Sequence, residues 1–77
     1  RISREQLSVR EHMSIVLRAL QGRKFIEFEK LFDVTRGVPV LIVTFIAMLE
    51  LAKETLIEVT QAEAFAPIYV RLAYSPA

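Results

Sequence analysis

This sequence has few of the residues from which metal and cofactor sites are built. The chain has no cysteine, one histidine and two glycines, the glycines at positions 22 and 37. Without cysteine it can form neither a disulfide nor a thiolate metal site, and a single histidine cannot supply the ligands of a zinc site. Two glycines so far apart do not make a glycine-rich phosphate loop. We therefore expect no cofactor and no bound metal.

Catalysis by the remaining polar side chains is not expected either. His12 falls near the apolar face of the first expected helix, where a histidine usually has a backbone or solvent partner. No serine or carboxylate is spaced to form an obvious triad with it. Glu27 and Glu29 flank a junction between two short elements and take ordinary capping and surface roles. The sequence thus predicts a domain that is not an enzyme.

The chain also lacks a strong excess of either charge. Positive and negative side chains are interspersed, and the formal net charge is +1. A surface of this kind produces no strong field that would attract nucleic acid or a membrane. We find neither a signal peptide nor a transmembrane segment in the pattern. Because the first residue is Arg1 rather than methionine, we expect a piece of a longer protein.

The longest apolar stretch covers residues 38–53, VPVLIVTFIAMLELAK. From residue 38 to residue 52 only Thr44 and Glu50 carry polar side chains, whereas a surface helix usually shows an apolar stripe of about 100° and a charged back. Leucine, methionine and alanine favour a helix, and Pro39 fits a first turn because its missing N–H needs no partner there. The stretch predicts a buried helix that is too short for a bilayer crossing of about 20 residues.

The other elements follow from caps and periodicity. Ser8 and Glu11 form a capping box, and Gly22 suits the end of the helix that this box begins. In chain order we expect a helix at 9–21, an extended piece at 23–27, a short helix at 28–32, the long helix at 38–53, and strands at 56–60 and 67–72. The two strands alternate with period two and predict an antiparallel hairpin. This order predicts an α+β winged helix, with a three-helix core and a two-stranded wing.

The pattern also predicts the domain limits and the core. We expect a linker or frayed lead-in at 1–7, the winged-helix domain at 8–73 and a tail at 74–77. Side chains that follow the period of their element should share one core. These are Val16, Leu17, Leu20, Phe28, Phe32, Ile57, Val59, Ile68 and Val70.

The long helix has more apolar surface than so small a domain can cover. At about 100° per residue its side chains fall into three arcs. The arcs are Leu41, Ile42, Phe45, Leu49 and Ala52; Thr44, Met48 and Leu51; and Val40, Val43 and Ala47. Two modest helices and a hairpin can cover about two of them. Either the whole helix is core or one arc faces a partner, since exposed apolar patches usually mark interaction sites.

Residues 43–72 resemble the C-terminal winged-helix domain of kleisins, the subunits that close SMC chromosome-condensing rings. The matching features are Thr44-Phe45 with Leu49-Glu50-Leu51, and then Gln61-x-Glu63-Ala64-Phe65-x-x-Ile68. The front end, Ser8-Val9-Arg10-Glu11-x-Met13 followed by Phe25-x-x-Phe28, resembles the bacterial kleisin family, segregation and condensation protein A (ScpA). The chain departs from this family at Val38-Pro39-Val40, where members tend to carry charged residues.

The resemblance implies a role in binding. The C-terminal domain of a kleisin caps the ATPase head of an SMC subunit through its third helix, with a phenylalanine and a leucine four residues apart. Phe45 and Leu49 match these two contacts, and Ile42 lies beside them, so we expect these three residues to bind the partner. ATP would belong to the SMC protein, and Phe65 would pack the wing onto the core. The resemblance also implies a cytoplasmic, nucleoid-associated protein, with a second regulatory subunit bound through other parts of it.

Two other functions remain open at this stage. A DNA-binding winged helix would present arginine, lysine, asparagine or glutamine to bases and phosphates, but the long helix offers Lys53 alone. Arg23, Lys24 and Arg36 fall in expected loops with acidic neighbours, so we expect no specific nucleic acid as a partner. A self-association module needs only an apolar helix that packs on its own copy.

Overall fold

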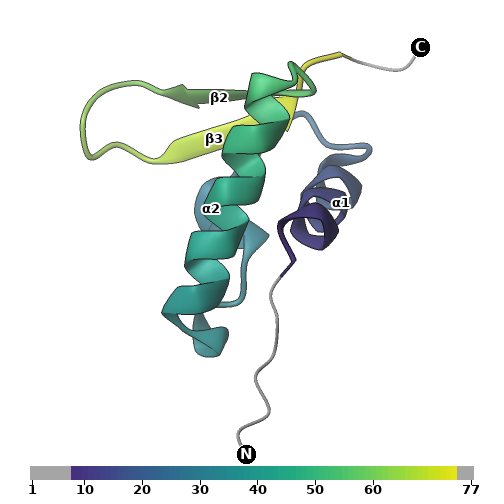
Figure 1. Cartoon of the computed structure of the whole chain (residues 1–77). Coiled ribbons are helices and arrows are strands. Elements are labelled where there is room, and N and C mark those ends of the chain that lie inside the picture. Colours follow the sequence, from purple (N-terminus) through teal and green to yellow (C-terminus); the bar gives the residue numbers. More distant parts are fainter. Residues whose placement is uncertain (1–7, 75–77) are drawn as a thin grey trace, which may run out of the picture.

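The computed structural model describes residues 8–74 of the chain, which form two α-helices and a small sheet (Figure 1). The elements are α1 (Val9–Leu20), β1 (Ile26–Glu27), the 3₁₀ turns η1 (Phe28–Leu31) and η2 (Val34–Arg36), α2 (Val38–Lys53), β2 (Ile57–Gln61) and β3 (Ile68–Leu72). Figure 1 shows α2 crossing the sheet, with α1 on one side of it and the hairpin of β2 and β3 extending on the other. The expected lead-in at 1–7 and most of the expected tail at 74–77 lie outside the described residues.

This architecture confirms the α+β winged helix, with corrections to its details. The sheet has three antiparallel strands in the order β1-β3-β2, not two. Ile26 pairs with Val70 and Glu27 pairs with Tyr69, so the short extended piece before η1 covers the second edge of β3. The expected short helix is a 3₁₀ turn that ends at Leu31, and the expected loop before α2 contains the second 3₁₀ turn. Short turns of this kind have no periodicity long enough to distinguish them in a sequence.

Local capping explains where α1 begins and ends. The Ser8 hydroxyl accepts a hydrogen bond from the Glu11 backbone N–H at 3.1 Å, as the capping box predicts. The last helical residue is Leu20, and Gly22 has a left-handed φ of 74° just beyond it. His12 is buried, and its Nδ1 lies 2.9 Å from the Ser8 carbonyl oxygen. The backbone partner expected for this histidine is thus Ser8, one turn earlier in the helix.

The segment before α2 is shaped by side-chain caps. Asp33 accepts hydrogen bonds from the Thr35 backbone N–H at 2.9 Å and from the Thr35 hydroxyl at 2.6 Å. Thr35 belongs to η2, and Gly37 directly precedes α2. Gly37 has a φ of 88°, which an L side chain rarely adopts, and Pro39 follows in the first turn of α2. The glycine therefore makes the sharp entry into the long helix possible.

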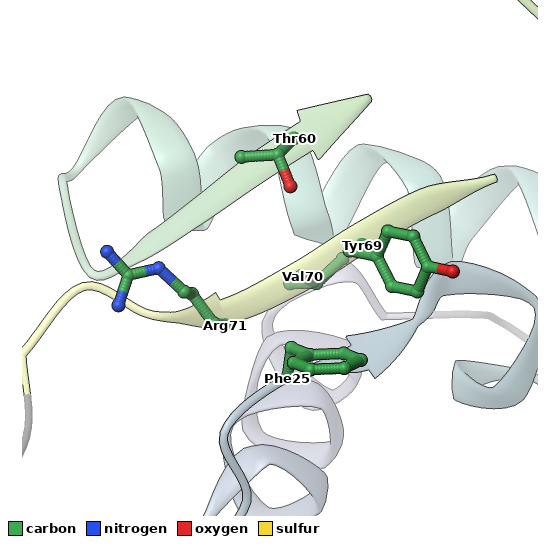
Figure 2. A pocket seen from close by; sticks show the side chains of 5 residues that line it. All are labelled: Phe25, Thr60, Tyr69, Val70 and Arg71. Atoms are coloured by element: carbon green, nitrogen blue, oxygen red, sulfur yellow. The ribbon is translucent and has the colours of Figure 1, made fainter. Parts of the chain in front are cut away.

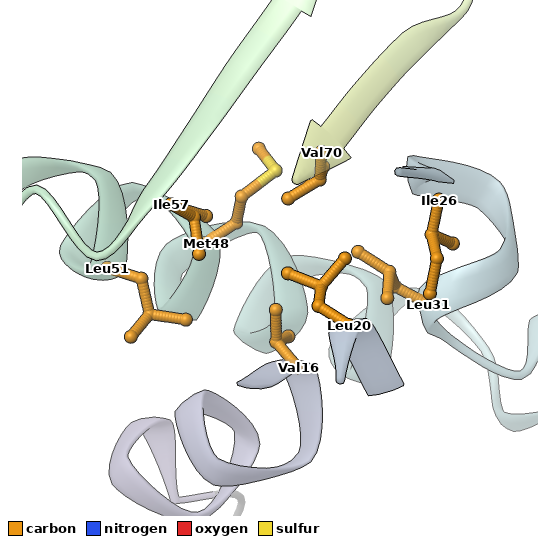
Figure 3. Packing of buried hydrophobic residues seen from close by; sticks show 8 residues of the cluster. All are labelled: Val16, Leu20, Ile26, Leu31, Met48, Leu51, Ile57 and Val70. Atoms are coloured by element: carbon orange, nitrogen blue, oxygen red, sulfur yellow. The ribbon is translucent and has the colours of Figure 1, made fainter. Parts of the chain in front are cut away.

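The core lies where α1, α2 and the inner face of the sheet meet (Figure 3). Eight buried hydrophobic side chains form it: Val16, Leu20, Ile26, Leu31, Met48, Leu51, Ile57 and Val70. Figure 3 shows that they come from both helices, η1 and all three strands. Every main element of the domain is therefore held by one continuous apolar cluster.

The predicted core is partly confirmed. Val16, Leu20, Ile57 and Val70 are buried, whereas Leu17, Phe28, Phe32 and Ile68 are half-buried at its margin. Val59 is exposed, so its prediction is wrong. Val59 pairs with Val70 and shares a face with Ile57, but only the first residue of β2 is buried. Period-two alternation gives the face of a side chain but does not tell whether a helix reaches far enough along the strand to cover it.

Candidate protein-binding surface

One side of α2 is buried and the other is left exposed. The buried residues are Val40, Val43, Thr44, Ala47, Met48 and Leu51, which are the second and third arcs predicted for this helix. The exposed large hydrophobic residues are Val38 (62% exposed), Ile42 (52%), Phe45 (40%), Ile46 (40%) and Leu49 (49%). The interpretation that the whole helix is core is therefore wrong. We call these five exposed residues the α2 face.

The α2 face is one contiguous patch. With about 100° between successive residues, its five side chains fall within an arc of about 100°. Ile42 and Ile46 are four residues apart, and so are Phe45 and Leu49, so the side chains form two neighbouring rows along the helix. The three sequence-predicted partner residues, Ile42, Phe45 and Leu49, all lie on this face.

The two long edges of the α2 face differ in chemistry. On one edge the ring of Phe45 packs against Phe28, with centroids 5.9 Å apart and an interplanar angle of 80°. Phe28 also contacts Phe32, at 5.3 Å between centroids. On the other edge Ile46 lines a groove between α2 and α1, which Arg10, Glu50 and Glu54 border with charge. The apolar surface therefore continues past Phe45 to Phe28, whereas beyond Ile46 the apolar residues Met13 and Leu17 of the groove lie among charged side chains.

The tip of the wing provides a further exposed aromatic residue. Phe65, in the turn between β2 and β3, is fully exposed and has a left-handed φ of 68°. The expectation that Phe65 packs the wing onto the core is therefore wrong. The turn is held by the Gln61 side chain, which donates to the Ala66 carbonyl oxygen at 2.8 Å. This bond closes the turn around Phe65, and the sequence carries no signal that the ring stays in solvent.

A second apolar hollow lies on the outer face of the sheet (Figure 2). It has a volume of about 240 Å³ and is lined by Phe25, Thr60, Tyr69, Val70 and Arg71. The rings of Phe25 and Tyr69 meet edge to face, with centroids 5.2 Å apart. Arg71 is paired with Glu58 on the neighbouring strand. Its polar groups are the hydroxyls of Thr60 and Tyr69 and one paired guanidinium, so it offers no acid–base pair for catalysis.

Charged side chains border α2 but do not lie on the α2 face. Lys53 lies at the end of the helix, highly exposed, with its Nζ 3.8 Å from Glu50. The α2 face itself contains no arginine, lysine, asparagine or glutamine that could contact bases or phosphates. Among residues 8–74 no three histidine, aspartate or glutamate side chains gather as a metal site would require. No helix in the described part of the chain is long and apolar enough to cross a membrane.

Comparisons with a family model and with individual known proteins all point to the same family. A family model described as segregation and condensation protein ScpA matches residues 1–73. Segregation and condensation protein A of Coxiella burnetii is 47% identical over 70 residues, which are 91% of this chain and 26% of that protein. The protein of the same name from Xylella fastidiosa is 46% identical over 91% of this chain and 23% of its own length. That of Listeria monocytogenes is 42% identical over 92% of this chain and 29% of its own length. The chain thus spans about a quarter of the length of these relatives.

Proposed function

Because the chain belongs to the segregation and condensation protein A family, we propose that it is the domain with which such a subunit binds the ATPase head of an SMC protein. The observation that carries the proposal is the exposed α2 face, which includes Ile42, Phe45 and Leu49. In this role the domain is an adaptor without catalysis, and any ATP belongs to the partner. The whole protein would act in chromosome segregation and condensation, in the cytoplasm at the nucleoid, with a regulatory subunit bound elsewhere along its length.

The physical support is the energy available at the α2 face. A phenylalanine side chain presents about 200 Å², and Phe45 is 40% exposed. A partner that covers the remaining area of about 80 Å² gains about 2 kcal/mol at 25 cal/mol per Å². Leu49, which is about half exposed, adds a similar amount. Apolar anchors of this size at the centre of a patch are typical of binding hot spots.

The test is a titration of this chain with an SMC ATPase head. Phe45→Arg should weaken binding by at least about 2 kcal/mol, which is about 30-fold in Kd, because a cation would be desolvated against the partner. The variant should remain folded, since the side chain can reach water in the free domain. Phe25→Arg is the matched control, because Phe25 is also an exposed phenylalanine but lies on the sheet side. Equal binding by Phe45→Arg and the unchanged chain would refute the proposal.

Self-association is a second candidate because the same exposed face could pack against a second copy. Sedimentation of the unchanged chain, at concentrations above and below the Kd for the head, separates the two cases. Dimers that persist in the presence of excess head, and that Phe45→Arg converts to monomers, would favour self-association. DNA binding has no comparable support from the α2 face, which is apolar along its length.

A further inference from the structure

Phe65 occupies a position that disfavours it in two ways. Its φ of 68° lies in the left-handed region, where a bulky side chain is a rare outlier and glycine or asparagine is common. Its ring is also fully exposed to water. Neither feature helps the free domain to fold. A strained, exposed residue of this kind points to a role outside the fold.

The turn around Phe65 holds the ring in a defined place. The Gln61 side chain donates to the Ala66 carbonyl oxygen at 2.8 Å, and the Ala66 N–H donates to the Glu63 carbonyl oxygen at 3.0 Å. Both bonds close across Phe65 in the chain. A ring presented in this way loses less conformational freedom on binding than one on an unconstrained loop.

An apolar path connects Phe65 to the α2 face. Phe45 of that face packs edge to face against Phe28, with ring centroids 5.9 Å apart. Phe28 in turn lines a hollow of about 220 Å³ together with Glu29, Phe65, Ala66, Pro67 and Ile68. The hairpin extends on the side of α2 away from α1 (Figure 1). The surface from Leu49 to the wing tip therefore passes the rings of Phe45 and Phe28, and then Glu29, before it reaches Phe65.

The size of the α2 face indicates that a partner must reach beyond it. Phe45 leaves about 80 Å² exposed and the other four side chains leave similar areas, so the α2 face offers about 400 Å² of accessible surface. A specific interface takes about 800 Å² from each partner. Toward α1 the adjoining groove is bordered by Arg10, Glu50 and Glu54. The opposite edge continues through the Phe28 ring toward the wing tip, and among residues 8–74 Glu29 is the one charged residue that lines the hollow there.

We propose that Phe65 is a second anchor for the protein that binds the α2 face, so that the partner contacts helix and wing tip together. This inference rests on the proposed function, in which the partner is an SMC ATPase head. The partner would present an apolar pocket for the phenyl ring next to the surface that covers Phe45. Aromatic side chains that insert into such pockets are frequent hot spots.

The test uses Phe65→Asn, because asparagine tolerates a left-handed φ and removes the ring. Binding to the SMC head should weaken at least 10-fold, while the melting temperature should stay the same or rise because backbone strain is relieved. Phe65→Tyr should retain most of the affinity. Tyr74→Asn is the control, since Tyr74 is an exposed aromatic residue near the other end of β3 and should bind normally.

The outcomes separate this inference from the proposed function. Normal binding by Phe65→Asn together with weak binding by Phe45→Arg would overturn the wing-tip anchor and leave the α2 face in place. Weak binding by Phe65→Asn with normal binding by Phe45→Arg would refute the α2 face, and with it the joint contact of helix and wing tip. A clearly lower melting temperature of Phe65→Asn would show that the ring serves the fold, and would overturn the inference.

Discussion

Leu49 and Leu51 allow a direct test of which side of α2 serves the fold and which serves a partner. They are the same residue type two positions apart on one helix, so helix propensity affects both equally when each becomes alanine. Leu51 is fully buried in the core cluster, whereas Leu49 is 49% exposed. A difference between Leu51→Ala and Leu49→Ala in the free energy of unfolding therefore reports how deeply each leucine is buried.

The magnitudes follow from that burial. Leu51→Ala removes a fully buried side chain and leaves a cavity, which costs about 3 kcal/mol in the free energy of unfolding. Leu49→Ala loses about half of the burial of a leucine and leaves no closed cavity, so the cost is about 1 kcal/mol. A domain of this size is stable by roughly 4–11 kcal/mol in total. The Leu51→Ala melting temperature should fall by well over 10 °C, because 1 kcal/mol corresponds to about 4–8 °C here.

Urea denaturation followed by circular dichroism measures both costs, and titration with an SMC head measures binding on the same two variants. Leu51→Ala should cost more stability than Leu49→Ala, but we expect Leu49→Ala to have the larger effect on binding. Leu49→Ala should weaken binding about tenfold or more, whereas Leu51→Ala should bind normally at a temperature where it is folded. Equal losses of stability in the two variants would refute the assignment of the two sides of α2. Equal binding would refute the role of Leu49 at the interface.

Two further predictions concern polar groups in the fold. Thr44 is buried, and its hydroxyl has no hydrogen-bond partner among the described residues, so Thr44→Val should raise the free energy of unfolding by about 1 kcal/mol in urea denaturation; a loss of stability would contradict this. Hydrogen bonds from the Thr35 hydroxyl and then its backbone N–H hold the pKa of Asp33 below its ordinary value of 3.8. A lowered pKa stabilises the domain above that value and ceases to do so as the pH falls through the pKa of the folded state. The difference in the free energy of unfolding between the unchanged chain and Asp33→Ala should therefore be largest at pH 7 and shrink below about pH 4. A difference that does not change with pH would contradict the lowered pKa of Asp33.

The elements that the sequence determined by itself are those with local causes. Ser8 and Glu11 fix the start of α1 through a hydrogen bond that spans three residues. The composition of residues 38–53, together with Pro39 near the start, predicts α2 with the bounds that the structure has. The alternating segments around Ile57 and Val70 likewise predict the two hairpin strands. Each of these signals acts within a few positions of the chain, so no knowledge of distant contacts is needed.

The exposure of particular side chains was decided by tertiary structure. Because α2 is apolar almost all the way round, its sequence has no polar face that would mark the solvent side. The placement of α1 and the sheet leaves Ile42, Phe45 and Leu49 exposed while Met48 is buried. In the sequence, periodicity placed Phe45 and Leu49 in one arc of the helix, and the family resemblance then singled out this pair as partner contacts.

The same limit explains the remaining differences. β1 is two residues long and forms only because Val70 and Tyr69 offer a free strand edge, which is distant in the chain. Val59 follows the alternation of β2 but lies beyond the one buried residue of that strand. Phe65 is exposed because no other element in residues 8–74 covers the tip of the wing. Periodicity records which side chains point the same way. Whether another element covers them depends on contacts between distant segments, and only the folded arrangement supplies those contacts.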